Sequence, residues 1–295
     1  MRFSSPARAI CVLSILSAPA LSGVIRHDVD DALYRELGEQ AQFGAVGATS
    51  IFFSNGQSTN CSGTLVSEQW VLTAAHCVDR AVSTGIFTAG SSFGFVEEIV
   101  IHPDWERNNF LGGGDLALLK LSAPITTINP ATIYSGDQEL GSLATLIGYG
   151  QTGTGETGAI FGSHGTLRGG NNVIDELGTA RGWDERILLT DFDSPINPDE
   201  SIYGDSNPVA LEYSIGPGDS GGAMFIETVM GWRLAGVTSF INSTDGSPNG
   251  DYGDSNGFTR VSDYAGWINS IIPTPGTIPM LAGGILMATR RRRNA

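Results

Sequence analysis

The stretch Gly218-Asp219-Ser220-Gly221-Gly222 surrounds a single serine with three glycines. Glycine accepts backbone conformations that side chains disfavour, so this stretch predicts a tight turn that a substrate backbone can approach closely. The hydroxyl of Ser220 is then available as a nucleophile. The backbone N–H groups of Gly218 and Ser220 are placed to point at one oxygen and to stabilise the negative charge that develops there.

Two upstream residues supply the groups that such a serine needs. A serine hydroxyl is a poor nucleophile near neutral pH unless an imidazole takes its proton and an anion fixes the tautomer of that imidazole. His76, in the stretch Thr-Ala-Ala-His-Cys, is the candidate base, and Asp115, which opens the run Asp-Leu-Ala-Leu-Leu-Lys-Leu, is the candidate anion. Asp79 and Asp104 compete for the second role, but only Asp115 opens an alternating apolar run.

The three segments, in this order, resemble the trypsin/chymotrypsin-like serine proteases, which keep the chain order His, Asp, Ser. The similarity runs from about Phe43 to Ile272. It implies that Ser220 attacks the substrate carbonyl, that His76 acts as the general base and that Asp115 orients His76. Four further segments carry the resemblance: Cys61–Val66, Leu146–Gly150, Gly236–Phe240 and Gly257–Val261.

The composition favours an all-β fold. Forty glycines, many short apolar runs rich in Val, Ile, Phe and Thr, and few helical periodicities indicate many strands and turns. The resemblance implies two six-stranded antiparallel β-barrels, at about 43–135 and 136–260, followed by a short helix at 261–272. The division is expected near residues 130–142. The run Gly153–Gly158 fits a dinucleotide-binding pattern, but no helical pattern follows it, so it is interpreted as a barrel loop.

The beginning of the chain is typical of a secretory signal. Residues 1–22 contain basic residues, then an apolar stretch, then small residues, with cleavage expected after Ala20 or Ser22. Residues 23–42 are then the first segment of the mature chain. The protein is therefore expected to be exported, and to be extracellular or associated with the cell surface.

The end of the chain, residues 273–295, places a proline-containing motif before a short apolar run and an arginine cluster. This order resembles the PEP-CTERM sorting tail of Gram-negative and related bacteria, which implies an exosortase-like sorting machinery as a partner. Thr274 stands where that tail usually has Glu. The twelve mostly apolar residues 278–289 are fewer than the about 20 that a spanning helix needs, and a plain membrane anchor is the alternative.

Cys61 and Cys77 would be the cysteines left after loss of the signal, because Cys11 lies within it. They flank the His76 segment as the histidine-loop disulfide of the resembled family does, which implies the same bond here. An exported chain can keep such a bond oxidised. Two cysteines alone offer only half a zinc site, so no metal is assigned to them.

The chain is strongly acidic. Its formal net charge is −15, and six of its 16 basic residues lie in terminal segments that hold no Asp or Glu, so the remainder carries ten basic against 31 acidic residues, a net charge of −21. Such a surface repels nucleic acid and anionic membranes. Acidic loops are usually solvated, but they can also supply the oxygen ligands of calcium, although no EF-hand spacing is present. The carboxylates concerned are Asp191, Asp193, Asp199, Glu200 and Asp205.

The amino end departs from the family pattern. Family members usually mature by cleavage before an Ile-Val-Gly-Gly-like sequence, and the new amino group pairs with the aspartate that precedes the nucleophile. Asp219 is present, but no such sequence stands near Phe43. Val24 and Ile25, close to the expected signal cleavage, are the nearest apolar start. We hypothesise that signal removal leaves an amino end able to reach Asp219.

Matching outward from Ser220 places Ser214 at the base of the specificity pocket and Ile241 in its wall. A neutral base offers no counter-ion for Arg or Lys, and a branched wall fills the space that an aromatic ring needs. A small or medium apolar residue before the scissile bond is therefore expected. The resemblance also implies that Ser239 pairs its backbone with the substrate.

These features predict an exported serine endopeptidase that hydrolyses protein or peptide substrates through an acyl-enzyme. It is expected to work as a monomer, without a metal or an organic cofactor and without binding nucleic acid. Two alternatives stay open. One is a catalytically inactive surface-binding module on a protease-like scaffold, because a fold does not guarantee chemistry. The other is an esterase that uses the same triad.

Overall fold

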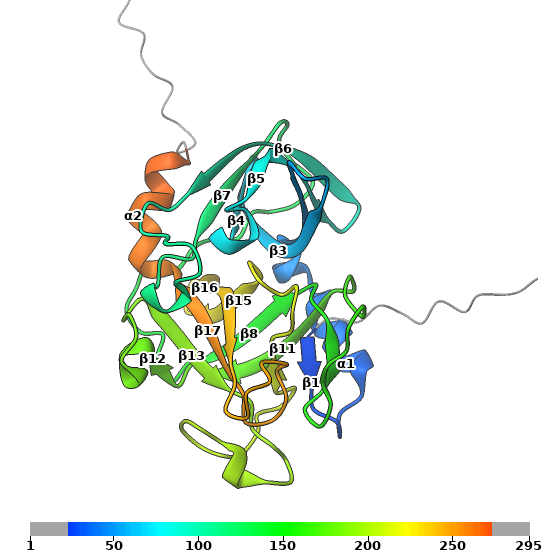
Figure 1. Cartoon of the computed structure of the whole chain (residues 1–295), viewed down its shortest axis with the longest axis vertical. Helices are drawn as coiled ribbons and strands as arrows, with labels where there is room; N and C mark the ends of the chain where they lie inside the picture. Colours follow the sequence, from blue (N-terminus) through cyan, green and yellow to red (C-terminus); the bar gives the residue numbers. More distant parts are fainter. Residues whose placement is uncertain (1–22, 273–295) are drawn as a thin grey trace, which may run out of the picture.

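The computed structural model describes residues 23–272. The expected signal peptide (1–22) and sorting tail (273–295) lie outside the described residues. No helix in the described part of the chain is long and apolar enough to cross a membrane. Strands dominate this part, in two halves that stand one above the other in Figure 1.

The first half is a closed barrel of six antiparallel strands. They are β2 (Val46–Phe53), β3 (Ser58–Ser67), β4 (Trp70–Thr73), β5 (Ala81–Ala89), β6 (Ser92–Ile101) and β7 (Ala117–Leu121). The order around the barrel is β2-β3-β4-β7-β6-β5, and every neighbouring pair is antiparallel. The six-stranded barrel that the sequence predicts here is confirmed.

The second half is built on an open sheet of seven strands. They are β8 (Leu143–Gly148), β11 (Arg168–Val173), β12 (Glu176–Leu177), β13 (Ile187–Asp191), β15 (Ala223–Thr228), β16 (Gly231–Asn242) and β17 (Ser255–Arg260). The order is β11-β8-β15-β16-β17-β13-β12, and the edge strands β11 and β12 do not pair with each other. The all-β class is confirmed, but this half is a half-barrel rather than a closed six-stranded barrel.

A separate four-stranded sheet flanks the second half and accounts for part of this difference. It consists of β1 (Gly23–Ile25), β9 (Thr152–Thr154), β10 (Gly158–Ala159) and β14 (Tyr213–Ser214). β1 lies between β9 and β14, so the start of the described chain is built into the second half. The run Gly153–Gly158 forms the turn between β9 and β10. A Cβ atom on Gly153 would lie 1.7 Å from the carbonyl oxygen of Gly158, so the close approach requires glycine there.

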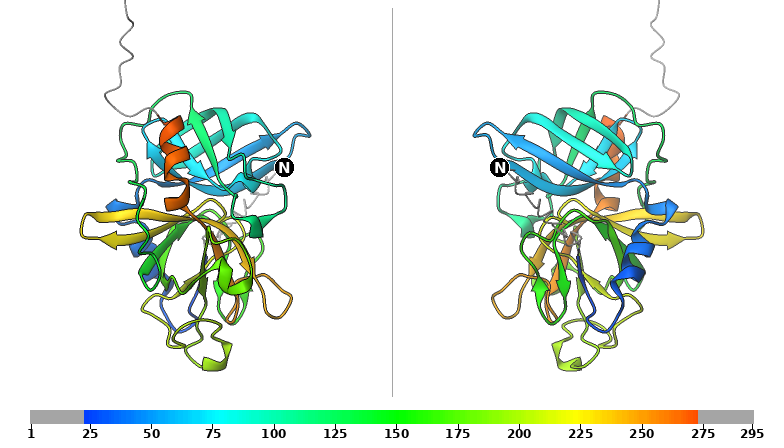
Figure 2. Two further views of the ribbon diagram at one scale, coloured as in Figure 1. Left: turned by 90° about the vertical axis from the view of Figure 1, so that its left-hand side faces the viewer. Right: turned by 90° about the vertical axis from the view of Figure 1, so that its right-hand side faces the viewer.

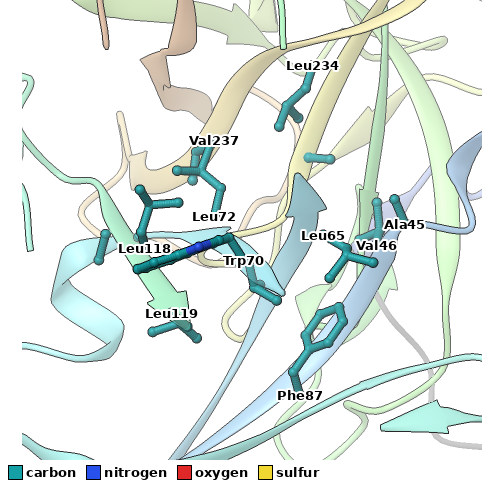
Figure 3. Close-up of a cluster of buried hydrophobic side chains, with 14 of the residues drawn as sticks. Ala45, Val46, Leu65, Trp70, Leu72, Phe87, Leu118, Leu119, Leu234 and Val237 are labelled. Carbon is teal, nitrogen blue, oxygen red and sulfur yellow. The ribbon is translucent and has the colours of Figure 1, made fainter. Parts of the chain in front are cut away.

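A buried hydrophobic cluster runs from the first barrel into the second sheet. Burial of this shared apolar surface fixes the two halves relative to each other. In both views of Figure 2 the two halves lie one above the other. The side chains labelled in Figure 3 belong to this cluster: Ala45, Val46, Leu65, Trp70, Leu72, Phe87, Leu118 and Leu119 from the first half, with Leu234 and Val237 from β16.

Two α-helices complete the fold. The helix expected at 261–272 is confirmed as α2 (Val261–Ile271), which packs its buried face against the first barrel (Figure 1). A second helix, α1 (Asp31–Gly38), was not predicted. The Asp30 carboxylate caps it, and Asp31 binds the fully buried Arg168 of β11 at 2.5 and 2.9 Å, so α1 is attached to the second half.

Candidate active site

His76 and Asp115 come from neighbouring strands of the first barrel. His76 lies in the 3₁₀ turn η2 (Ala75–Cys77) that follows β4, and Asp115 lies just before β7. β4 and β7 are antiparallel, with Thr73 opposite Ala117, so the end of one strand meets the start of the other. This pairing brings both side chains to the same edge of the barrel.

The Asp115 carboxylate holds His76 through both of its oxygens. Oδ1 accepts the backbone N–H of His76 at 2.9 Å, and Oδ2 lies 2.7 Å from His76 Nδ1. The Ser239 hydroxyl also donates to Oδ2, and the Thr259 hydroxyl donates to the Asp115 carbonyl oxygen at 3.0 Å. Because a carboxylate only accepts hydrogen bonds, Nδ1 carries the proton and Nε2 is left as the base.

Asp79 and Asp104, the two competing carboxylates, are bound to arginines. Asp79 Oδ2 accepts from Arg107 Nε at 3.0 Å, and Asp104 Oδ2 accepts from Arg186 Nη1 at 2.5 Å. Neither is paired with His76 in the described part of the chain. The geometry therefore favours Asp115 as the orienting group.

Ser220 lies in a turn that joins the second half to the first barrel. Its carbonyl oxygen accepts the N–H of Ser62, on β3, at 2.8 Å. The turn depends on glycines, because Gly218 has a φ of 99° and Gly221 a φ of 80°. A Cβ atom on Gly221 would also lie 2.2 Å from the hydroxyl oxygen of Thr73.

The Ser220 hydroxyl is not hydrogen-bonded to the His76 ring in the described structure. His76 Nε2 and the Ser220 carbonyl oxygen each lie 3.8 Å from Cys77 Sγ. Both residues are therefore close to this sulfur atom. Contacts between a nucleophile and its base are often long in free enzymes and tighten in the substrate complex.

Cys77 is bonded to Cys61, so the disulfide that the resemblance implies is confirmed. The bond fastens the His76 turn to β3. The ligand atoms of Cys61, His76 and Cys77 lie within 4.8 Å of one another. With the two sulfurs joined, neither is available as a thiolate, so this group does not fit a zinc site.

The N–H groups of Gly218 and Ser220 donate no hydrogen bond within residues 23–272. The N–H groups of Asp219, Gly221 and Gly222 in the same turn all do. A substrate oxygen can therefore bind to the first two groups without breaking an existing bond. Donors without an internal acceptor are one requirement of an oxyanion hole.

Asp219 is buried beneath the nucleophile turn. Its Oδ1 accepts the N–H of Gly150 at 2.7 Å, and its Oδ2 accepts the N–H of Gly216 at 2.8 Å. A Cβ atom on Gly148 would lie 2.1 Å from Asp219 Oδ1, so this close approach also requires glycine. The carboxylate is held between two segments of the second half.

The amino end of β1 leads toward Asp219. β1 is parallel to β9, with Gly23 opposite Thr152, and antiparallel to β14, with Val24 opposite Ser214. Thr152 lies two positions after Gly150, and Ser214 lies two positions before Gly216. Gly150 and Gly216 are the two residues whose N–H groups bind Asp219. Val24 is fully buried, which anchors β1 in this position.

A cavity of about 240 Å³ opens beside Ser220. Ser239 and Ile241, the two pocket residues expected besides Ser214, both line it. None of its lining residues is charged, and most of the wall is apolar. The remaining lining residues are Ile215, Gly216, Pro217, Phe240 and Pro248.

Ser214, the expected base of the pocket, does not line this cavity. It is fully buried, and its hydroxyl donates to Asn256 Oδ1 at 2.9 Å. Asn256 Nδ2 in turn donates to the hydroxyl of Thr190 at 3.2 Å. Sequence reasoning missed Asn256, because its partner Ser214 lies 42 positions away in the chain.

An aromatic surface next to His76 was also missed. The ring of Phe110 contacts the His76 ring edge to face, with centroids 5.2 Å apart. The ring centroid of Phe240 lies 6.3 Å from that of Phe110 and 5.6 Å from that of Trp183. The three aromatic residues come from separate segments, so only the fold brings them together.

The acidic segment (residues 192–212) connects β13 to β14. Asp199 and Asp205 are exposed and Glu200 is half-buried, as solvated loop residues are. Asp193, and Asp191 at the end of β13, are buried instead. The five expected carboxylates are therefore divided between solvent and the protein interior.

Similarity to known proteins extends over most of the chain. The Trypsin family model matches residues 37–268. Chymotrypsin-like elastase family member 1 of Canis lupus familiaris is 28% identical over 233 residues, which cover 72% of this chain and 81% of that protein. The protein of the same name from Homo sapiens is 29% identical, with the same two coverages of 72% and 81%.

Two solved structures share the fold. HL collagenase gives a TM-score of 0.60 at 23% identity and covers 86% of this chain and 100% of its own. Neuropsin, a serine protease expressed in the limbic system of mouse brain, gives a TM-score of 0.60 at 20% identity, with coverages of 80% and 98%. With the family model matching residues 37–268, this protein belongs to the trypsin family of serine proteases.

Proposed function

We propose that the protein is a serine endopeptidase whose catalytic triad is Ser220, His76 and Asp115. Membership of the trypsin family implies protein or peptide substrates. The observation that carries the triad is the double contact of the buried Asp115 carboxylate with the Nδ1 and the backbone N–H of His76. This contact leaves His76 Nε2 as the base on the side of the ring that meets the Ser220 turn.

In the proposed reaction, Ser220 Oγ attacks the carbonyl carbon of the scissile bond while His76 Nε2 takes the hydroxyl proton. The N–H groups of Gly218 and Ser220 stabilise the resulting oxyanion. His76 then donates the proton to the leaving amine, the C–N bond breaks and an acyl-enzyme remains. A water molecule that gives its proton to His76 releases the acyl group and restores the Ser220 hydroxyl.

The proposed preference is for a small or medium apolar residue before the scissile bond. The cavity of about 240 Å³ beside Ser220 has an uncharged lining, and Ile241 occupies part of its wall. A cationic side chain would lose its hydration there without gaining a counter-ion. The similarity to proteins named chymotrypsin-like elastase supports the same preference.

The proposed activation step is removal of the signal peptide. Cleavage after Ser22 would free the amino group of Gly23 at the start of β1, whose partners β9 and β14 lie close in the chain to Gly150 and Gly216, the residues that bind Asp219. An ion pair between this amino group and the Asp219 carboxylate would brace the turn that holds Ser220. No separate activating protease would then be needed.

The proposed location is outside the cell or on its surface. The signal-like pattern in residues 1–22 supports export, and the tail at 273–295 supports recognition by an exosortase-like sorting machinery. The Cys61–Cys77 disulfide fits an oxidising compartment. The protein is proposed to act as a monomer.

Matched peptide substrates test the reaction and the preference together. Otherwise identical peptides would carry Ala, Val, Phe or Arg before the scissile bond, and an ester of the same acyl group would be assayed beside them. We expect kcat/KM for Ala or Val to exceed that for Phe and for Arg by roughly 10-fold or more. Faster cleavage after Arg would refute the preference. Turnover of the ester without any peptide would favour the esterase.

A further inference from the structure

Ser62 of β3 contacts the turn that holds Ser220 (residues 217–222, the nucleophile turn) with its backbone and with its side chain. Its N–H donates to the Ser220 carbonyl oxygen at 2.8 Å, and its hydroxyl donates to the Gly218 carbonyl oxygen at 3.1 Å. The same hydroxyl oxygen accepts the N–H of Tyr149 at 3.0 Å. Ser62 is fully buried. A single shielded hydroxyl therefore joins the first barrel to two segments of the second half.

The carbonyl groups of the nucleophile turn are occupied while two of its N–H groups are not. The four successive carbonyl groups of residues 217–220 each accept a hydrogen bond. Ser62 binds the second and the fourth of them, those of Gly218 and Ser220. Within residues 23–272, the N–H groups of the same two residues donate no hydrogen bond. Ser62 thus holds the two residues that present the proposed oxyanion donors.

The peptide unit between Gly218 and Asp219 links the two donors along the chain. Its N–H donates to the Gly216 carbonyl oxygen at 2.9 Å, and its carbonyl oxygen accepts from the Ser62 hydroxyl. Gly218 has a φ of 99°, and a glycine by itself resists rotation only weakly. The hydroxyl therefore fixes a unit whose rotation would move one donor relative to the other. Such donors must lie about 2.7–3.1 Å from the position of the oxyanion.

β3 also holds the turn that carries His76. The Ser62 carbonyl oxygen accepts from the Thr73 hydroxyl at 2.8 Å, and Thr73 ends β4, three residues before His76. Cys61, the residue before Ser62, is bonded to Cys77, the residue after His76. Two successive residues of one strand are therefore attached to the turn of the proposed base and to the turn of the proposed nucleophile.

We propose that Ser62 is a positioning residue for the oxyanion hole. Its hydroxyl holds the Gly218–Asp219 peptide unit so that the N–H groups of Gly218 and Ser220 converge on one oxygen before the substrate arrives. Donors that are already in place need no rearrangement as the negative charge develops, so they stabilise the transition state. Ser62 acts through the backbone of the turn, and this role rests on the proposed peptidase function.

Ser62→Ala should lower kcat for a peptide substrate by roughly 10-fold or more. Complete loss of one oxyanion donor costs about 10²–10³ in kcat, and a displaced donor should cost a part of that. KM should stay within about 2-fold of the wild type, because the lost interaction is made in the transition state and not with the bound substrate. Ser62→Gly also lacks the hydroxyl and should show the same loss, so either variant decides if the other does not fold.

Ser255→Ala is the matched control. Ser255 is also fully buried, and its hydroxyl donates to the Asn242 carbonyl oxygen at 3.3 Å and accepts from Asn242 Nδ2 at 3.1 Å. Neither residue lines the cavity beside Ser220. The control loses one donated and one accepted hydrogen bond, as Ser62→Ala does, and should also unfold at a lower temperature, but its kcat should stay near that of the wild type. An equal loss of kcat in both variants would assign the effect to general destabilisation and would overturn the proposal.

A peptidyl trifluoromethyl ketone probes the oxyanion hole without a leaving group. Ser220 Oγ adds to its carbonyl carbon, the hydroxyl proton passes to His76, and the carbonyl oxygen becomes an oxyanion. Its Ki should rise in Ser62→Ala by roughly the factor by which kcat/KM falls. The matching peptidyl alcohol forms no oxyanion and should keep its wild-type Ki. Equal weakening of both inhibitors would indicate a distorted substrate site and would overturn the positioning role.

The wild-type assay separates failure of this inference from failure of the proposed function. An active wild type whose kcat is unchanged in Ser62→Ala and in Ser62→Gly would overturn the role of Ser62 alone. A folded wild type that cleaves no peptide and does not bind the ketone would refute the proposed peptidase, and the role of Ser62 with it.

Discussion

Asp115 fixes the geometry of the site at the scale of single residues. It is fully buried, and its two carboxylate oxygens accept hydrogen bonds from the backbone and the ring of His76 and from the Ser239 hydroxyl. A carboxylate held at both oxygens cannot turn away from the ring, so the orientation of His76 follows from it. The proposed chemistry at Ser220 thus depends on a residue that a substrate does not touch.

Asp115→Asn should lower kcat by about 10⁴-fold while the protein stays folded, the loss known for this substitution in the family. An amide presents an N–H as well as an oxygen, so His76 can adopt the tautomer that lacks a base at Nε2. Steady-state hydrolysis of a peptide substrate measures the change. Asp79→Asn, at a carboxylate bound to Arg107 instead of His76, is the matched control and should stay near wild-type activity. Equal activity of the two variants would contradict the role of Asp115.

Ile241→Gly should shift the preference toward larger residues before the scissile bond. Removing a branched side chain from the wall of the cavity makes room for an aromatic ring. The ratio of kcat/KM for a Phe peptide to that for an Ala peptide should rise by roughly 10- to 100-fold. Ile196→Gly, at an isoleucine that is 68% exposed and outside this cavity, should leave the ratio unchanged. A ratio that does not respond to Ile241→Gly would remove this residue from the specificity wall.

The residues predicted from sequence and those missed differ in how their contacts arise. His76, Asp115 and Ser220 stand in short motifs whose local pattern already indicates a role. Asn256 accepts a hydrogen bond from Ser214, which is 42 positions away in the chain. The sequence around either residue does not indicate this contact. Phe110 reaches His76 only because the loop before β7 folds back over the end of β4. Such contacts belong to the tertiary structure.

At the scale of elements, α2 is attached to the first barrel partly through a buried histidine. His102 lies edge to face against Tyr264 and Trp267 of α2, with ring centroids 4.7 and 4.8 Å away. His102 Nδ1 accepts the N–H of Asp104 at 3.1 Å, so that nitrogen carries no proton. Burial lowers the pKa of His102, the Asp104 carboxylate opposes this, and Arg186 adds to it. The folded protein therefore keeps the ring neutral.

Stability should fall as the pH falls below about 6.5, the ordinary pKa of histidine, because the unfolded chain takes up a proton that folded His102 resists. The stabilisation that neutral His102 contributes is complete above that pH. It is lost as the pH falls toward and through the pKa of His102 in the folded protein, which is the lower of the two. Urea unfolding of the wild type and of His102→Asn measures this effect. The amide oxygen of the variant can still accept the Asp104 N–H. The free energy of unfolding should depend less on pH in the variant than in the wild type. His164→Asn, at an exposed histidine, should retain the wild-type dependence. Identical pH dependence in all three proteins would refute the assignment.

Sequence patterns predict some elements of the fold and miss others. The first barrel and α2 follow from apolar runs and from family motifs, and both are confirmed. α1 is only eight residues long and depends on the Asp30 cap and the contact between Asp31 and Arg168, a partner that is distant in the chain. The second half contains an open sheet of seven strands, and β1 and β14 pair in a separate sheet beside it. No local pattern indicates that choice of partners.

At the scale of the whole molecule, the proposed activation step would connect Gly23, at the start of the described chain, to Asp219 in the proposed catalytic turn. Blocking the α-amino group of the mature protein by acetylation should lower kcat/KM by roughly 10-fold or more, because the buried Asp219 carboxylate would lose its ion-pair partner. The active form should begin at or near Gly23 by intact mass. Asp219→Asn should already be impaired and should not respond further to acetylation. An active form that begins well downstream of Ile25 would dismiss this activation route.

Labelling by a fluorophosphonate probe tests whether Ser220 is the nucleophile. The purified mature protein would be read for adduct mass, beside hydrolysis of a mixed peptide library. We expect one adduct per chain on Ser220, cleavage of the library, and loss of both in Ser220→Ala. A folded protein with a correctly processed amino end that takes up no label and cleaves no peptide would contradict the proposed peptidase and favour a binding module on a protease scaffold.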